Sequence, residues 1–182
     1  MKLFVTRHGE TAWNAKRLIS GLSDIPLAEK GIEQAQALAR MLAAHQDEYQ
    51  IKHIVVSHLQ RACVTASYIE KALGLIAVVD KRLCEIDFGN FEKTSTRSEA
   101  FLKNKANPYK RFGGGESILH AAHRIYAAIE DAKNLYAPDN VLFVCHGMIS
   151  IIVSTYFLDY ETIDDFMNIH IENCGLQIYE MQ

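Results

Sequence analysis

The chain has 182 residues, 49% of them hydrophobic and 23% charged, a balance that is typical of a folded globular protein and excludes a disordered chain. Its formal net charge of −3 gives no bulk attraction to nucleic acid, and its most apolar stretch is too short to span a membrane. The first residues lack the basic flank and apolar core of a signal peptide. We therefore expect one cytoplasmic domain over residues 1–182, a monomer or homodimer that binds neither membrane nor nucleic acid.

The N-terminal stretch predicts a buried strand that ends at a reactive pair. Residues 1–5 are a short apolar run, so the strand should end near Thr6, with Arg7 and His8 at its carboxyl end. Ligands bind at that end of the strands in open α/β sheets. A neutral imidazole is a nucleophile near pH 7, and a neighbouring guanidinium offers two parallel donors to an anion such as phosphate. The alternative is that His8 merely terminates a strand.

A polar loop follows over residues 10–26. Asn14 and Ser20 have side chains that can donate to phosphate oxygens, and Gly21 lets backbone N–H groups approach a ligand. Taken singly, such residues are usually plain loop residues. The next segment is predicted to be a supporting helix, because apolar residues recur at helical spacing: Ile32, Ala35, Leu38, Ala39 and Leu42.

The middle of the chain predicts two more strands and two more candidate residues. The β-forming run over residues 51–57 leads into a helix with Arg61 in its first turn, where the helix N-terminus already favours an anion. The alternative for Arg61 is a charge on an exposed helix face. A short strand over residues 76–79 precedes the loop that carries Glu85, and a lone loop glutamate is usually solvated.

The segment from Lys93 to Arg111 is irregular and holds six basic residues against one acid. It either recruits a second anionic group of a substrate or forms a solvated loop. After it, Gly113–Ser117 should open a helix capped by Ser117 or a glycine, with a clear apolar face.

The C-terminal part predicts a further strand over residues 141–145, with His146 and Gly147 at its end, then a helix over 149–158. Residues 168–171 and 176–180 are predicted to be closing strands. Three strand ends thus carry polar residues, namely Arg7 with His8, Ser57, and His146, and the carboxyl ends of parallel strands meet at one edge of a sheet. This convergence favours a site over three separate structural residues.

Six blocks of the sequence, in order, resemble the histidine phosphatase superfamily, the phosphoglycerate-mutase-like fold. They are RHGETAWN, RLISGLSDIPL, SHLQRACVTA, LCEIDFGNFE, GGES and CHG. The chain departs from the family pattern at His58, Phe91 and Lys93, where proline, tryptophan and glycine are usual. The resemblance implies a three-layer α/β/α sandwich with a mostly parallel central sheet.

The resemblance also implies a mechanism. His8 attacks phosphorus and becomes phosphohistidine, Arg7, Arg61 and His146 bind the equatorial oxygens, and Glu85 protonates the leaving oxygen and then activates water. The remaining implied substrate-binding residues are Asn14, Ser20, Gly21 and Gly147. No cofactor or metal is implied. The four cysteines include no C-x-x-C pair, which speaks against a zinc ribbon.

Only residues 93–115 separate the acid block from the GGES turn, where true mutases carry a long insertion. The resemblance therefore implies a metal-independent, histidine acid phosphatase-type phosphomonoesterase that acts on a small phosphorylated metabolite. The alternatives are an alpha-ribazole phosphatase of cobalamin synthesis, a cofactor-dependent phosphoglycerate mutase, and a phosphate-binding regulator that has lost catalysis.

Overall fold

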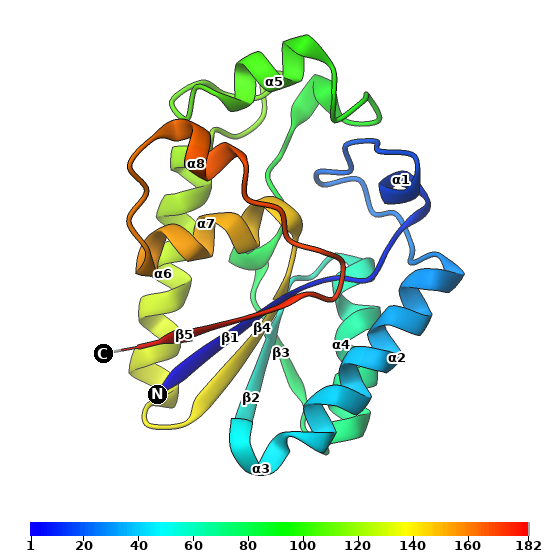
Figure 1. Ribbon diagram of the computed structural model, residues 1–182, viewed down its shortest axis with the longest axis vertical. Coiled ribbons are helices and arrows are strands. Elements are labelled where there is room, and N and C mark those ends of the chain that lie inside the picture. Colours follow the sequence, from blue (N-terminus) through cyan, green and yellow to red (C-terminus); the bar gives the residue numbers. More distant parts are fainter. Residues whose placement is uncertain (182) are drawn as a thin grey trace.

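The computed structural model describes residues 1–181 and is built around a five-stranded sheet with the order β3-β2-β4-β1-β5 (Figure 1). The strands are β1 (Lys2–Arg7), β2 (Ile51–Val56), β3 (Ala77–Val79), β4 (Asn140–Cys145) and β5 (Leu176–Glu180). The first four run parallel, and only β5 is antiparallel, beside β1. The predicted mostly parallel sheet is confirmed.

Helices cover both faces of this sheet, which confirms the three-layer arrangement. On one face lie α2 (Glu29–Ala44) and α4 (Gln60–Leu73), and on the other α6 (Ile118–Tyr136) and α7 (Gly147–Phe157) (Figure 1). Side chains of a strand alternate between the two faces. Phe4 accordingly packs in the cluster under α2 and α4, whereas Leu3 and Val5 pack in the cluster under α6 and α7.

Shorter elements complete the chain, and three of them lie beyond the carboxyl ends of the parallel strands (Figure 1). Those three are α1 (Ala12–Ala15), α5 (Glu99–Lys105) and α8 (Ile163–Met167). The others are α3 (Gln46–Tyr49) and the 3₁₀ turns η1 (Lys81–Leu83) and η2 (Gly89–Phe91). No helix within residues 1–181 has the length and apolar character needed to cross a membrane.

Two predicted segments differ from the structure. The loop over residues 10–26 contains α1, because the side chains of Thr11 and Asn14 cap that turn reciprocally. The predicted strand over residues 168–171 is wrong: α8 ends at Met167, and the chain then crosses the site in irregular conformation. There the carbonyl of Ile171 accepts a hydrogen bond from the Arg7 guanidinium, 2.8 Å away, instead of joining a ladder.

Candidate functional site

His8 stands immediately after β1 and is almost fully buried. Its Nδ1 lies 2.7 Å from the carbonyl oxygen of Gly9, so Nδ1 carries the ring proton and donates it there. The lone pair therefore resides on Nε2, which faces Arg61. Burial, with the charges of Arg61 and Arg7, holds the pKa of His8 well below its ordinary value. The imidazole is thus a neutral nucleophile with its reactive nitrogen oriented.

Two arginines bring positive charge to this imidazole. Arg61, at the start of α4, is 0% exposed and donates from Nε to His8 Nε2 at 3.2 Å. Its other nitrogens donate to the backbone carbonyls of Gly21 and Ser23, which fix the guanidinium plane. Among residues 1–181, neither Arg61 nor Arg7 forms an ion pair with a carboxylate. Burial lowers the pKa of both arginines, as expected for cations without a close counter-ion.

The second histidine of the site, His146, follows β4 and is completely buried. Its ring centroid lies 5.1 Å from that of His8. The Ser57 hydroxyl oxygen accepts a hydrogen bond from the backbone N–H of Leu59, and it is hydrogen-bonded to His146 Nε2 at 2.7 Å, with the direction set by the His146 tautomer. Within residues 1–181, His146 Nδ1 has no partner. Three strand ends therefore converge, as predicted.

The polar loop after β1 supplies further donors. Asn14 Oδ1 accepts from both the backbone N–H and the hydroxyl of Thr11, so its Nδ2 remains available to a ligand. The hydroxyl of Ser20 is buried, lines the pocket and has no partner among residues 1–181. Gly21 has φ of +49°, and a Cβ there would lie 2.2 Å from a Glu92 carboxylate oxygen. The backbone conformation therefore favours glycine, and a larger residue would also displace the Glu92 carboxylate.

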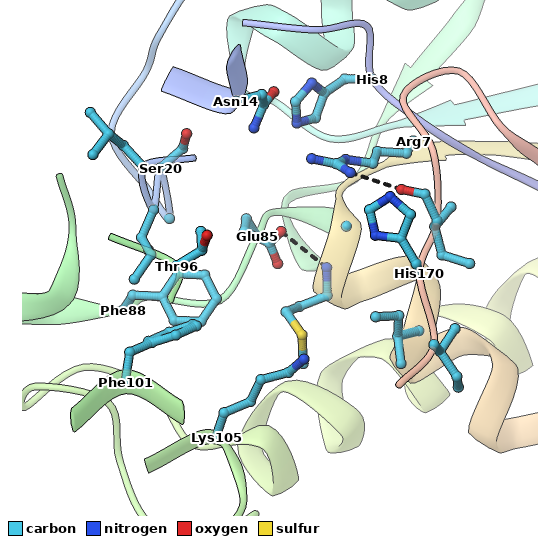
Figure 2. A pocket seen from close by; sticks show the side chains of 18 of the residues that line it. Arg7, His8, Asn14, Ser20, Glu85, Phe88, Thr96, Phe101, Lys105 and His170 are labelled. Carbon is cyan, nitrogen blue, oxygen red and sulfur yellow. Dashed lines mark hydrogen bonds between the residues drawn. The ribbon is translucent and has the colours of Figure 1, made fainter. Parts of the chain in front are cut away.

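Glu85 lies across the pocket from His8 (Figure 2). It is buried, and burial raises its pKa. Hydrogen bonds from the backbone N–H groups of Ile86 and Met148 oppose this shift. The charges of Arg61 and Arg7 also oppose it. Its carboxyl group thus holds a proton to a higher pH than an exposed glutamate does. That property suits a general acid.

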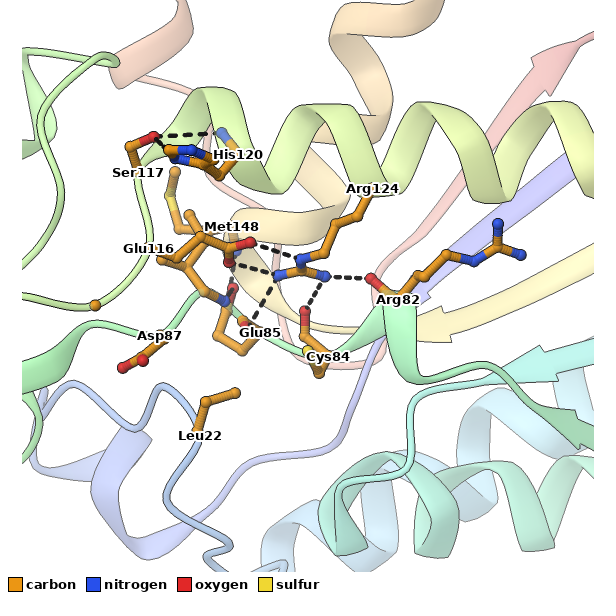
Figure 3. A network of polar contacts seen from close by, with 12 residues as sticks. Leu22, Arg82, Cys84, Glu85, Asp87, Glu116, Ser117, His120, Arg124 and Met148 are labelled. Carbon is orange, nitrogen blue, oxygen red and sulfur yellow. Dashed lines mark hydrogen bonds and ion pairs between the residues drawn. The ribbon is translucent and has the colours of Figure 1, made fainter.

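A polar network behind Glu85 holds its loop in place (Figure 3). The Arg124 guanidinium, on α6, donates to the backbone carbonyls of Arg82, Cys84 and Glu85. It also forms a two-pronged ion pair with Glu116, in the GGES turn, at 2.9 and 2.8 Å. Arg124 was not predicted from the sequence, because nothing local distinguishes this charge from others on a helix.

The predicted residues surround one pocket of about 220 Å³. Eight of the nine either line it or contact it directly, and the ninth, His146, packs beside His8. Gly147 lines the pocket at the start of α7. Asn173 donates to the His8 carbonyl at 2.9 Å, and so ties the turn before β5 to the nucleophile. Within the described chain, no cluster of three or more His, Cys, Asp and Glu residues is arranged to hold a metal ion.

Three buried polar atoms of the site have no partner in the described part of the chain, which predicts anion binding that stabilises the fold. They are Arg7 Nε, Ser20 Oγ and His146 Nδ1. A ligand at one hundred times its Kd adds about 2.7 kcal/mol to the free energy of unfolding. For a domain of this size, that is an increase in Tm of roughly 5–10 °C with inorganic phosphate or vanadate, measured by scanning calorimetry.

The control for this measurement is sodium chloride at matched ionic strength. Arg61→Gln should abolish the increase in Tm, whereas Arg40→Gln, on the exposed side of α2, should retain it. An unchanged increase in Arg61→Gln would place the anion elsewhere on the protein.

Sequence comparison assigns the chain to a family over nearly its whole length. Residues 3–182 match the histidine phosphatase superfamily (branch 1). A relative from Proteus mirabilis, described as probable phosphoglycerate mutase GpmB, is 36% identical over 155 residues, which span 81% of this chain and 70% of the relative. A Cronobacter sakazakii protein with the same description is 36% identical over 163 residues, or 85% of this chain and 74% of that one.

Solved structures agree with this assignment. A mycobacterial glucosyl-3-phosphoglycerate phosphatase in complex with VO3 has a TM-score of 0.86 and 26% identity, covering 97% of this chain and 91% of that one. A phosphoserine phosphatase from Entamoeba histolytica shares the fold, with a TM-score of 0.85 at 24% identity over 100% of this chain and 91% of that one. From the family match and these relatives, the chain belongs to the histidine phosphatase superfamily.

Proposed function

We propose that this protein is a phosphomonoester phosphatase that acts through a phosphohistidine intermediate. One observation carries the proposal: a neutral imidazole with an oriented lone pair lies beside two guanidinium groups that have no carboxylate partner within residues 1–181. A phosphoryl group offers the imidazole a phosphorus atom to attack, and it offers the two guanidinium groups a negatively charged partner.

In the proposed reaction, His8 Nε2 attacks phosphorus while the bond from phosphorus to the ester oxygen breaks. Glu85 gives its proton to that oxygen, and the alcohol leaves. The Arg61 Nε–H turns from the His8 lone pair to a phosphoryl oxygen, and Arg7, His146, Asn14 and Ser20 donate to the others.

In the second step, Glu85, now ionised, takes a proton from water. The resulting hydroxide attacks phosphorus, the bond between nitrogen and phosphorus breaks, and inorganic phosphate leaves with His8 neutral again. Each group thus returns to its starting state, and the residues named supply the charge compensation that Mg²⁺ supplies in kinases.

The test is hydrolysis of p-nitrophenyl phosphate in buffer that contains EDTA. We expect release of inorganic phosphate at the same rate with and without the chelator. Inhibition by EDTA that added metal reverses would overturn the metal-free mechanism. Absence of turnover on this ester and on a collection of phosphorylated metabolites, alpha-ribazole phosphate among them, would favour the phosphate-binding regulator instead.

A second candidate, phosphoglycerate mutase, is favoured by the description of the relatives that match most of the chain. Against it, only residues 93–115 separate the acid block from the GGES turn. The two activities differ in where the phosphoryl group goes. With 3-phosphoglycerate and a trace of bisphosphoglycerate, a phosphatase releases inorganic phosphate, whereas a mutase yields 2-phosphoglycerate without loss of phosphate.

A further inference from the structure

The pocket has two halves of different chemistry. The half around His8 is rich in donors, as described above. The half that would hold the leaving group is mostly apolar. Its polar side chains are the amine of Lys105 and the hydroxyl of Thr96, with the exposed imidazole of His170 at the rim (Figure 2). The apolar side chains that line this half are Phe88, Phe101, Leu102, Met148, Ile151, Ile169 and Ile171.

The structure of α5 explains why Lys105 points into the pocket. The Ser98 side chain caps the helix, and Phe101 is buried among aromatic rings, with ring centroids 5.5 Å from Phe88 and 5.6 Å from Phe112. Residues four apart in a helix share a face. Lys105 lies four residues after Phe101 and is therefore directed over the pocket, whereas Lys103 is exposed.

Lys105 is a half-buried cation with no close counter-ion in the described chain. Within residues 1–181, its one hydrogen bond is a long one, 3.4 Å, to the Met167 carbonyl, and it forms no ion pair. Burial lowers the pKa of its ammonium group, and only the more distant charge of Glu85 opposes this shift. A buried charge that lacks a partner is unfavourable unless a ligand supplies one.

The structure also shows which basic residues of the segment from Lys93 to Arg111 can contact a ligand in the pocket. Of its six basic residues, only Lys105 lines this pocket. Arg111 instead donates to the Gly115 carbonyl, away from the leaving-group half. His170, at the pocket rim, has a side chain that is 71% exposed and lies 3.2 Å from a Glu172 oxygen, so its imidazole already has a partner.

We infer that Lys105 binds a carboxylate on the leaving group, so that the substrate class is a small phosphomonoester with one carboxylate on a largely apolar skeleton. The inference rests on the proposed function, because it identifies the leaving-group half from the position of His8 and Glu85. The pocket volume of about 220 Å³ is below the ~300–1,000 Å³ typical of sites for drug-sized ligands, which favours a small substrate.

A carboxylate fits this half of the pocket better than a second phosphate. One ammonium group compensates one negative charge, whereas a phosphomonoester carries about −1.5 to −2 near pH 7. The excess charge and the additional acceptor oxygens of a second phosphate would face the apolar side chains of Phe88, Ile151 and Ile169.

The test compares ortho-, meta- and para-carboxyphenyl phosphate with the corresponding carboxamides, which have the same shape but no charge. For the best-fitting isomer, we expect the wild type to prefer the carboxylate by roughly 10-fold or more in kcat/KM. Lys105→Gln keeps a donor for the Met167 carbonyl but removes the charge, and should reduce this preference to about 1. Lys103→Gln, two residues away on the exposed side, is the matched control and should retain it.

A second measurement does not depend on turnover. Binding of para-(phosphonomethyl)benzoate and its methyl ester to the His8→Ala variant, measured by calorimetry, should show the same preference for the carboxylate and the same loss in His8→Ala/Lys105→Gln. Equal affinities in both proteins, or a carboxylate preference that Lys105→Gln leaves intact across all isomers, would overturn the subsite while leaving the phosphatase proposal standing. Failure of the proposed function would instead appear as turnover that survives His8→Ala.

Discussion

Replacing His8 with alanine is expected to reduce kcat on p-nitrophenyl phosphate by at least ~10⁴-fold, the scale seen when a covalent nucleophile is removed. The reason is geometric. His8 Nε2 is the only imidazole nitrogen in the described pocket that combines a lone pair with a position between Arg61 and Arg7, because His146 Nε2 is occupied by the Ser57 hydroxyl. The variant should also fail to form an acid-labile phosphoenzyme from radiolabelled substrate.

The matched control is His45→Ala, at an exposed histidine that follows α2. It should leave both turnover and phosphoenzyme unchanged. If His8→Ala still traps phosphate at the wild-type level, another residue is the nucleophile. Loss of the ring removes two hydrogen bonds, one to the Gly9 carbonyl and one from Arg61 Nε, but it also removes a buried imidazole from beside two cations, and the variant should remain folded.

The sheet and the donor-rich half of the site were predictable because their signals are local. Each parallel strand is a short apolar run, and each strand end places its polar residue at the same edge of the sheet by geometry alone. His8, Ser57 and His146 therefore meet as the sequence analysis predicted. Arg61 was predictable for the same reason, since its place in the first turn of α4 fixes its direction.

The remainder of the site depends on contacts between distant segments. The strand predicted over residues 168–171 is absent because Ile171 bonds to Arg7, 164 residues earlier in the chain. Arg124 acts on the Glu85 loop from a helix about forty residues away in sequence. Gly9 also has a role that its sequence context did not indicate: a Cβ there would lie 2.3 Å from the Gly31 carbonyl oxygen, so close packing against α2 requires glycine.

The pKa of Glu85 depends both on its local backbone contacts and on residues from distant segments. Burial has the largest effect on its pKa and favours the protonated form. Backbone hydrogen bonds from Ile86 and Met148, and then the charges of Arg61 and Arg7, favour the ionised form. A general acid must be protonated when substrate binds, so the rate should fall as pH rises through this raised pKa. On the acid side, the lowered pKa of His8 keeps the nucleophile neutral below the usual histidine range.

Glu85→Gln is therefore expected to lower kcat/KM for an alkyl phosphate such as β-glycerophosphate by roughly 10²-fold or more, and for p-nitrophenyl phosphate clearly less. An alkoxide is a poor leaving group and needs the proton, whereas p-nitrophenolate leaves without it. The ratio kcat/KM is suitable because it reports only the steps up to the first irreversible one, which precedes the attack of water. Circular dichroism would verify that the variant is folded.

The same variant should also lose the alkaline decline of kcat/KM for β-glycerophosphate, because glutamine does not titrate. The ionisation of the substrate affects both proteins equally. Its contribution therefore cancels in the ratio of the wild-type kcat/KM to the variant kcat/KM at each pH. Glu99→Gln, at an exposed acid on α5, should behave like the wild type in both measurements. Equal losses on the alkyl and aryl esters, with the alkaline decline unchanged, would mean that Glu85 shapes the pocket and that the leaving oxygen takes its proton from another donor.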